Sequence, residues 1–232
     1  MASEFDAYAG NYRDIINKNA AITGETFEYF IGLRLGLVQE ALRAAGAASP
    51  QRILDFGCGV GATETQLRER FPEAKLEGVD DSKESLRAAE ALAIDRASFH
   101  LWDNARLPFE DGSIDLVYSN GTFHHVPHER HPLVFSELKR VLKPGGRAFI
   151  FENNPLNPLM VRGMRNNPFD ADAKMLFPWY LRRSMSRSGL KTESPYFYVF
   201  FPKQLKALRF TEPRLRRLPI GAQYFVQGLR QT

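Results

Sequence analysis

Short apolar runs alternate with amphipathic segments through the middle of the chain. The apolar runs, which are typical of buried strands, lie near residues 52–56, 75–80, 97–101, 114–119 and 147–152. Apolar positions at helical spacing lie between them, near residues 62–71, 83–93 and 128–141. Strands that alternate with helices form a parallel sheet covered on both faces, and ligands bind beyond the carboxyl ends of its strands. The pattern therefore predicts a doubly wound α/β fold.

The segments on either side of this core, which spans residues 50–152, carry different patterns. Residues 1–48 are expected to contain a long helix, because apolar residues recur at helical spacing at Phe27, Phe30, Ile31, Leu35, Val38 and Leu42. Residues 153–178 are too long for a simple connection and are expected to have a function of their own. Residues 179–232 complete the sheet, with late strands at Tyr196 to Phe200 and Gln223 to Gly228 around an insertion from Pro202 to Pro219. One domain of 232 residues accommodates all four parts.

Three alternating glycines end the first predicted strand, in residues 53–61, Ile-Leu-Asp-Phe-Gly-Cys-Gly-Val-Gly. This spacing allows a tight turn from strand to helix and a close approach of the backbone to a ligand. With Ala62 the run also fits the dinucleotide fingerprint, so a nicotinamide enzyme is an open alternative at this point. Asp80, at the end of the second strand, suits the two hydroxyls of a ribose, which both kinds of cofactor carry.

Segments further along the chain separate these alternatives. The loop at 55–61 and Asp80 are followed by Asp103, by Phe109-Glu-Asp-Gly-Ser-Ile-Asp-Leu-Val117 and by Leu142-Lys-Pro-Gly-Gly146. In this order and spacing they resemble the class I S-adenosyl-L-methionine (AdoMet)-dependent methyltransferases, most of which act on small molecules. The resemblance covers residues 50–152. It implies a Rossmann-like sheet of seven mostly parallel strands with the last strand antiparallel. It also implies AdoMet as the cofactor, released as S-adenosyl-L-homocysteine (AdoHcy).

The resemblance also implies which residues bind AdoMet. The glycine loop would hold the cofactor, Asp80 its ribose, and Asp103 would lie near the adenine amino group. In this family the N-terminal segment commonly folds over the cofactor, so residues 1–48 would form a helical lid, and residues 153–178 would cap the acceptor site. Within the lid Tyr12, or alternatively Arg13, could bond the AdoMet carboxylate; Tyr12 could equally pack on a helix. The expected cofactor-binding residues are Tyr12, Asp55, Gly57, Cys58, Gly59, Gly61, Asp80, Asp81, Asp103, Asn104 and Asn120.

Composition and charge indicate the cellular compartment and the kinds of partner to expect. The one cysteine, Cys58, excludes an internal disulfide, and together with the absence of a signal-peptide pattern this predicts a cytoplasmic protein without a membrane span. Residues 1–130 hold 13 Lys/Arg and 21 Asp/Glu, whereas residues 131–232 hold 18 and 6. The basic residues of the second half either form a solvated surface or attract an anionic substrate. Its cations are scattered and no RNA-binding motif accompanies them, so nucleic acid is not expected as a partner.

The acceptor chemistry depends on a few residues at the predicted strand ends. A hydroxyl acceptor needs a base, and the candidates are His124 and His125 after the fourth strand, followed by Glu152 at the end of the fifth. Alternatively one histidine caps the next helix and the other packs in the core. Four histidines fall between residues 124 and 131, but Pro127 and Pro132 interrupt any helical histidine face. No metal site is therefore expected.

These observations favour an enzyme that transfers a methyl group from AdoMet to a small polar acceptor, with an anionic acceptor left open. Oxygen is the preferred target atom, followed by nitrogen and carbon. A catalytically silent AdoMet-binding subunit that regulates a partner is the alternative of another class, because one fold hosts many functions. Both a monomer and a homodimer are compatible with the sequence.

Overall fold

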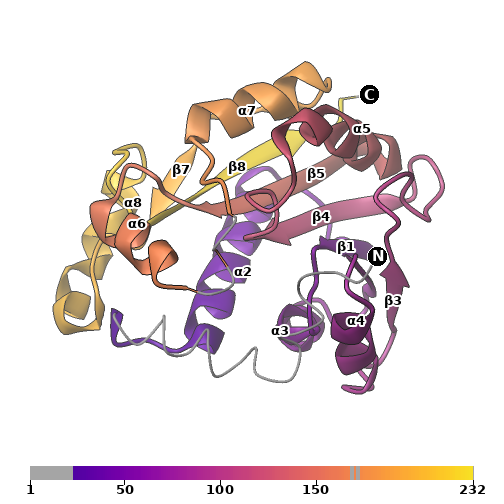
Figure 1. The fold of residues 1–232 in the computed structure, drawn as a ribbon, viewed down its shortest axis with the longest axis horizontal. Coiled ribbons are helices and arrows are strands. Elements are labelled where there is room, and N and C mark those ends of the chain that lie inside the picture. Colours follow the sequence, from indigo (N-terminus) through magenta and orange to yellow (C-terminus); the bar gives the residue numbers. More distant parts are fainter. Residues whose placement is uncertain (1–22, 168–169, 171–172, 232) are drawn as a thin grey trace.

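The computed structural model describes residues 23–167, residue 170 and residues 173–231, and Figure 1 shows them as a central sheet with helices packed around it. The parallel strands are β1 (Arg52–Phe56), β2 (Lys75–Asp80), β3 (Ala97–Leu101), β4 (Ile114–Asn120) and β5 (Leu142–Asn153). β8 (Gln223–Leu229) pairs with β5 in the antiparallel direction. The predicted doubly wound, mostly parallel sheet with an antiparallel last strand is confirmed.

The outer edge of the sheet differs in detail from the prediction. Within the described residues the sheet has eight strands in the order β3-β2-β1-β4-β5-β8-β6, and β7 also pairs with β8. β6 (Lys191–Thr192) and β7 (Tyr196–Tyr198) follow one another along the same edge of β8. Pro195 lies between them and has no N–H to donate to the ladder. β6 was not predicted, because the expected strand began at Tyr196. β7 also ends before residue 200, because Val199 has a φ of 58° and leaves the extended conformation.

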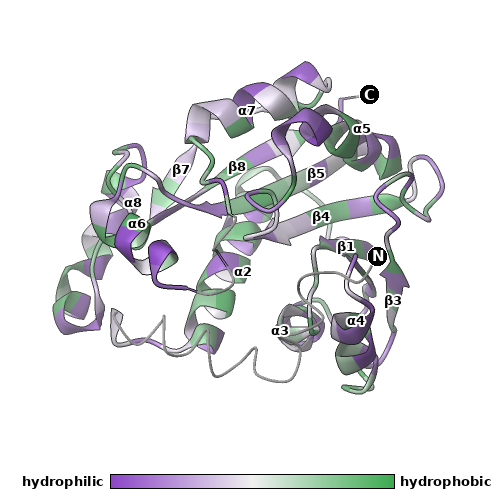
Figure 2. Ribbon diagram, in the orientation of Figure 1, coloured by the Kyte–Doolittle hydropathy of each residue, from purple (hydrophilic) through white to green (hydrophobic). Residues whose placement is uncertain are grey.

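Successive residues of the central strands face opposite layers of the core. Ile53 packs with α2 (Phe27–Ala44) and α3 (Ala62–Arg70), whereas Leu54 packs with α5 (His131–Val141) and α7 (Pro178–Arg187). α4 (Lys83–Glu90) lies beside α3 and packs against β2 and β3. Figure 2 shows the hydrophobic residues concentrated in β4, β5 and the inner sides of these helices. Both faces of the sheet are therefore buried, as a parallel sheet requires.

The long helix predicted near the N-terminus is present as α2. Its buried residues follow the predicted apolar positions, and the side chain of Thr26 caps it by accepting a hydrogen bond from the N–H of Tyr29. Residues 1–22 of the expected lid, with the candidate Tyr12, lie outside the described residues.

The two remaining predicted insertions fold into short helices. The expected cap, residues 153–178, contains α6 (Pro158–Arg165), which begins at Asn157, whose side chain accepts from the N–H of Met160. The insertion between the late strands forms the 3₁₀ helix η5 (Lys203–Thr211) and α8 (Glu212–Leu215). The 3₁₀ helix η3 (His128–Arg130) precedes α5 in the predicted 128–141 helix. Within the described residues, no helix combines the length and the apolar character that crossing a membrane would need.

Candidate functional site

The glycine loop (residues 57–61) leaves β1 at the carboxyl edge of the sheet. Gly57 has a φ of 80°, and a Cβ there would lie 2.1 Å from the hydroxyl oxygen of Thr122, so no other residue fits. Gly59 also has a positive φ, of 53°, but a Cβ there would meet nothing within 4 Å. The loop is therefore packed against Thr122 on one side and open at Gly59, where a ligand could approach the backbone.

Asp80 ends β2 directly beside this loop. Its Oδ2 accepts a hydrogen bond from the N–H of Gly59 at 2.9 Å, and its Oδ1 accepts one from the N–H of Ser82 at 2.9 Å. Each carboxylate oxygen retains acceptor capacity after one such bond. Asp80 is half-buried whereas Asp81 is exposed, which agrees with the preference for Asp80 as the residue at the strand end.

Two further carboxyl groups, of Asp55 and Glu64, are buried beneath the loop. Neither oxygen of Glu64 accepts a hydrogen bond from another described residue. Burial raises the pKa of Asp55 to about 8, and Asp80 adds to this rise, whereas Arg34 opposes it. Burial, with Asp55 nearby, also holds the pKa of Glu64 well above its ordinary value. A buried carboxyl group without a hydrogen-bond partner among the described residues, as at Glu64, favours a positive charge brought by a ligand.

Arg34 and Glu64 were not among the residues expected from the sequence. Arg34 is buried on α2, where its Nε donates to the hydroxyl of Tyr118 at 3.2 Å and one terminal nitrogen donates to Gln223 at 3.4 Å. An arginine next to Leu35 on the apolar face of a predicted helix was the available signal, since charged residues are rarely buried alone. Glu64, in the first turn of α3, carried no comparable signal.

The remaining candidates surround the loop. The N–H of Trp102 bonds to the carbonyl of Asp80 at 2.8 Å, which brings Asp103 next to β2. Asp103 is exposed and its Oδ1 accepts from the N–H of Ala105 at 2.9 Å, in a turn where Asn104 has a φ of 66°. The side chain of Cys58 is buried, and burial raises the pKa of its thiol, so it packs rather than reacts. Gly61 begins α3, and Asn120 ends β4.

The catalytic candidates His124 and Glu152 meet at the ends of β4 and β5. Nδ1 of His124 lies 2.5 Å from Oε2 of Glu152, and the other carboxylate oxygen accepts from the N–H of Phe123 at 2.9 Å. Burial alone would lower the pKa of His124, but Glu152 and Asp170 outweigh it and raise that pKa to about 10. His124 is therefore a cation at neutral pH and cannot accept a proton there.

Asp170, from the cap, completes this group of side chains. Its Oδ1 lies 3.3 Å from Nε2 of His124 and 3.7 Å from Nε2 of His125, and Asn167 donates to its Oδ2 at 2.7 Å. The N–H of Lys174 also donates to the carbonyl of His124 at 2.8 Å. The cap thus reaches the histidine pair through these contacts. Asp170 was not among the predicted residues, because no local pattern links it to residues 124–125.

The ligand atoms of His124, His125 and Asp170 all lie within 4.8 Å of one another, which is close enough to hold one metal ion. No metal site was predicted from the histidines of residues 124–131, but Asp170 comes from the cap, which is distant in the sequence. In this arrangement both ring nitrogens of His124 face carboxylates. As an imidazolium, His124 has no lone pair to offer a metal.

The other histidines of this segment have structural roles or lie at the surface. His131 is buried, with Nε2 bonded to the carbonyls of Phe123 and Val126 and Nδ1 bonded to the hydroxyl of Tyr180. The structural alternative predicted for the pair concerned His124 and His125. His124 is buried, but between two carboxylates, whereas His131 is the histidine that packs against Phe123 and Phe135. His128 is exposed and stacks on Tyr180.

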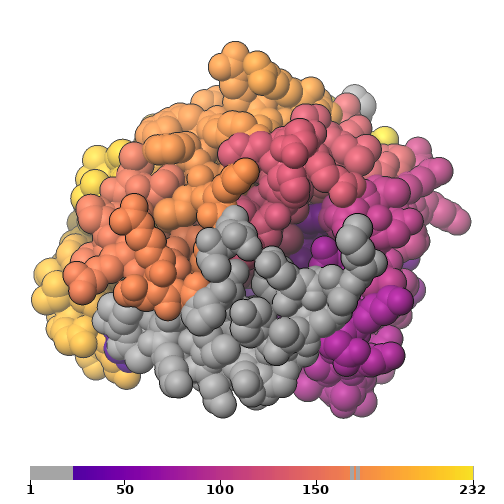
Figure 3. Space-filling view, viewed as in Figure 1, coloured from indigo at the N-terminus to yellow at the C-terminus, as the bar shows by residue number. Residues whose placement is uncertain are grey.

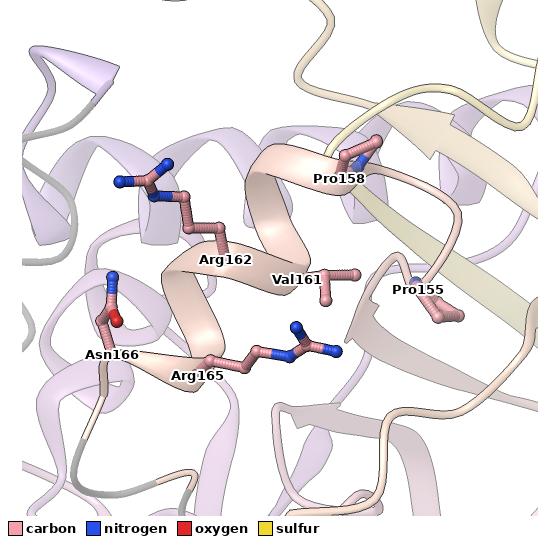
Figure 4. A pocket seen from close by; sticks show the side chains of 6 residues that line it. All are labelled: Pro155, Pro158, Val161, Arg162, Arg165 and Asn166. Atoms are coloured by element: carbon pink, nitrogen blue, oxygen red, sulfur yellow. The ribbon is translucent and has the colours of Figure 1, made fainter.

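An open pocket of about 510 Å³ lies along α6 and is lined by Pro155, Pro158, Val161, Arg162, Arg165 and Asn166. Figure 4 shows that the side chain of Arg165 runs back toward Val161 and Pro155, whereas Arg162 points to the other side of the helix. Pro155 follows β5 closely, so the guanidinium of Arg165 reaches toward the end of the strand that carries Glu152. An arginine in such a pocket can bind a carboxylate or phosphate.

Comparison with known proteins shows which family residues 53–146 resemble. Residues 53–146 match the family model described as a methyltransferase domain. Tocopherol O-methyltransferase of Arabidopsis thaliana is 34% identical over 129 residues, covering 50% of this chain and 36% of that protein. Trans-aconitate 2-methyltransferase of Pseudomonas paraeruginosa is 38% identical over 119 residues, covering 50% and 41%. The chain thus spans less than half the length of the curated relatives it matches.

The fold is shared with solved structures as well. An S-adenosylmethionine-dependent methyltransferase from Mesorhizobium loti superposes with a TM-score of 0.61 at 22% identity, covering 82% of this chain and 96% of that one. At this identity the likeness concerns the fold. It extends beyond residues 53–146 to most of the sheet.

Proposed function

Since residues 53–146 form a domain of the class I AdoMet-dependent methyltransferases, as the sequence predicted, we propose that this chain transfers a methyl group from AdoMet to an oxygen atom of a small anionic molecule. The observation that carries the proposal is the pair of buried carboxyl groups, Asp55 and Glu64, beneath the glycine loop. Bound AdoMet supplies an electrophilic methyl group on a positively charged sulfur and also carries an ammonium group. These two carboxyl groups favour such a cationic ligand over the negatively charged pyrophosphate of a dinucleotide.

The residues around the loop are assigned to the cofactor on this basis. Asp80, held by two backbone N–H groups, retains acceptor capacity for the two ribose hydroxyls. Gly59 leaves open space for the ligand, and exposed Asp103 lies next to β2, on the side where the adenine would extend. The other expected residues would surround the bound cofactor; they are Asp81, Asn104, Asn120, Gly57, Gly61 and Cys58.

The acceptor is assigned to the space between α6 and the histidine pair. The Arg165 guanidinium offers two parallel N–H groups to a carboxylate or phosphate. The relative named trans-aconitate 2-methyltransferase acts, by its name, on an anion of this kind. The basic second half of the chain would favour the approach of such an acceptor.

His125 is assigned the role of general base. His124 carries a proton at neutral pH and stays between Glu152 and Asp170, so it acts as a positioning residue. The side chain of His125 is 21% exposed and its Nε2 lies 3.7 Å from Asp170. An acceptor hydroxyl would pass its proton to His125 as its oxygen attacks, and the Asp170 carboxylate would stabilise the imidazolium that forms. Glu152 holds His124 in place and does not touch the reacting atoms.

Calorimetric titration with AdoMet and AdoHcy, with NAD as the control, tests the cofactor assignment. Micromolar binding of both adenosyl ligands and none of NAD is expected. A screen of hydroxy acids and phosphorylated alcohols with labelled AdoMet then tests the acceptor. Absence of AdoMet binding contradicts the proposal as a whole. Binding with methyl transfer only to nitrogen or carbon contradicts the oxygen assignment, and binding with no acceptor at all would favour a regulatory AdoMet-binding subunit.

A further inference from the structure

Large apolar side chains are exposed together at one end of the molecule, where the C-terminal insertion meets the start of α6. They are Leu156, Leu159, Leu205, Leu208, Phe210, Leu218 and Ile220, of which Leu159 is 78% and Phe210 73% exposed. Asn154 and Asn157 hold the two segments together by donating to the carbonyls of Pro219 and Ile220, at 3.1 and 2.8 Å. Figures 1 and 3 show α6 and the C-terminal insertion on the same side of the molecule. We call these seven residues the apolar end.

The helix η5 does not contribute to the core. It buries none of its residues, although three of its nine are Leu or Phe. A surface helix normally turns its apolar residues inward, so an outward-facing set needs another explanation. Arg209 is the residue of η5 that anchors it, through Glu25 and the hydroxyl of Tyr29, both at 2.8 Å. The leucines and Phe210 are thereby left on the outer side.

Cations surround the apolar end. Residues 203–220 contain six Lys/Arg and one acidic residue, Glu212, which accepts hydrogen bonds from the backbone N–H groups of Phe200 and Phe201. Arg209 is already paired with Glu25. The other basic residues of this segment are exposed; they are Lys203, Lys206, Arg214, Arg216 and Arg217. Apolar residues that project outward among Lys and Arg are typical of segments that lie in the interface of an anionic bilayer.

We propose that the apolar end, with the basic residues of 203–220, binds the surface of membranes that contain anionic lipids. The apolar side chains would enter the boundary between headgroups and acyl chains, and the lysines and arginines would pair with the lipid phosphates. A nucleic acid would use the cations but would leave Leu159, Phe210 and Ile220 without a role. α6 also carries Arg165, so docking would bring the α6 pocket close to the lipid surface. The inference uses no residue of the proposed catalytic machinery and holds whether or not methyl transfer is confirmed.

Flotation of the full chain with vesicles tests this proposal. Strong binding is expected with equal parts of phosphatidylcholine and phosphatidylglycerol, weak binding with phosphatidylcholine alone, and a marked loss in high salt. The double variant Phe210→Ser/Ile220→Ser should reduce binding to the mixed vesicles by more than about tenfold. The matched control is Leu101→Ser/Leu133→Ser, since these leucines are 46% and 48% exposed but lie on β3 and α5. Equal thermal melting of both variants would show that they fold.

Three results would overturn the proposal. One is absence of binding to the mixed vesicles, and another is binding that the Phe210→Ser/Ile220→Ser variant retains in full. The third is a concentration-dependent dimer, seen by light scattering, that this variant abolishes while vesicles are not bound by either protein. That result would assign the apolar end to a second copy of the chain.

Discussion

Nδ1 of His124 lies 2.5 Å from Oε2 of Glu152, with both side chains buried where two parallel strands end. His124 follows β4 and Glu152 lies near the end of β5, and the register of these strands places Asn120 opposite Phe151. The pair thus ties the turn after β4 to the neighbouring strand. Both side chains are almost fully buried, so Glu152 is compensated by His124, and His124 is compensated by Glu152 and Asp170.

Glu152→Gln should therefore destabilise the protein strongly. Removing one partner leaves the His124 cation without its nearest compensating charge, and breaking a buried pair costs about 3–5 kcal/mol. Urea denaturation followed by circular dichroism should show a lower midpoint with little change in slope. Glu129→Gln, at an exposed position in η3, serves as the control and should leave the midpoint unchanged. Equal midpoints for the two variants would mean that the pair contributes nothing to folding.

His125→Gln should leave the fold and AdoHcy binding intact but lower kcat by about 10²–10⁴. The reason is that His124 is held as a cation, which leaves His125 to take the proton from the acceptor. The measurement is methyl transfer to whichever acceptor the screen identifies. His128→Gln provides the control, since His128 is exposed and stacks only on Tyr180 and His131 in the described structure. Unchanged kcat in His125→Gln would exclude His125 as the base.

The parts of this molecule that follow local patterns could be predicted from the sequence. β1, β2, β3 and β4 lie in the short runs that were predicted as strands, and the glycines at 57, 59 and 61 take the positive φ values that a tight turn requires. The parallel direction of these strands followed from the alternation of strands and helices. Asp80 could be assigned to the strand end because carboxyl ends of parallel strands meet at one edge.

The parts that depend on long-range contacts could not be predicted. Asp170 reaches His124 only because the cap folds back over β4, and nothing near Asp170 in the sequence indicates this. β6 was not predicted either, because it has only two residues, Lys191–Thr192, and forms a strand only by pairing with β8. The outward orientation of Phe210 is equally hidden, because an apolar residue in a helical segment is normally expected to face the core.

Asp55 should make the stability of the ligand-free protein fall as pH rises. Its pKa is about 8 in the folded protein, against about 4 in an unfolded chain, so the folded state holds a proton between these values that the unfolded state has lost. The contribution of Asp55 to the free energy of unfolding should then decrease by up to about 1.4 kcal/mol per pH unit between about pH 4 and pH 8, and level off above. The groups that interact with the Asp55 carboxyl are Asp80, Glu64, Tyr118 and Arg34. Asp80 raises the pKa of Asp55 further, whereas Arg34 lowers it.

Urea unfolding at a series of pH values, compared with Asp55→Asn, isolates this effect. Asp55→Asn should be less sensitive to pH in the window from 6 to 8, because the amide does not titrate. Glu73→Gln, at an exposed acid far from the loop, should keep the full pH dependence. A wild-type stability that rises from pH 6 to 8 would contradict the raised pKa.

Removal of metal ions should leave methyl transfer unchanged. Although His124, His125 and Asp170 are close enough to chelate, His124 is protonated and engaged by two carboxylates, so the group works without a metal. Dialysis against a chelator followed by elemental analysis and an activity assay checks this. Stoichiometric zinc or manganese in the purified protein, with activity lost on dialysis and restored by the ion, would instead make these three residues metal ligands.

Asp80→Ala should weaken AdoHcy binding by roughly 100-fold, whereas Asp81→Ala should change it by less than about threefold. Asp80 offers two charge-assisted hydrogen bonds to the ribose, and each such bond contributes about 1.5–3 kcal/mol, part of which water replaces. Calorimetric titration of both variants under identical salt measures the difference. The two residues are adjacent, so general charge effects nearly cancel between them, and urea midpoints show whether both variants fold. If Asp81→Ala were the weaker binder, the ribose would belong to Asp81, and the strand-end argument that selects Asp80 would be wrong.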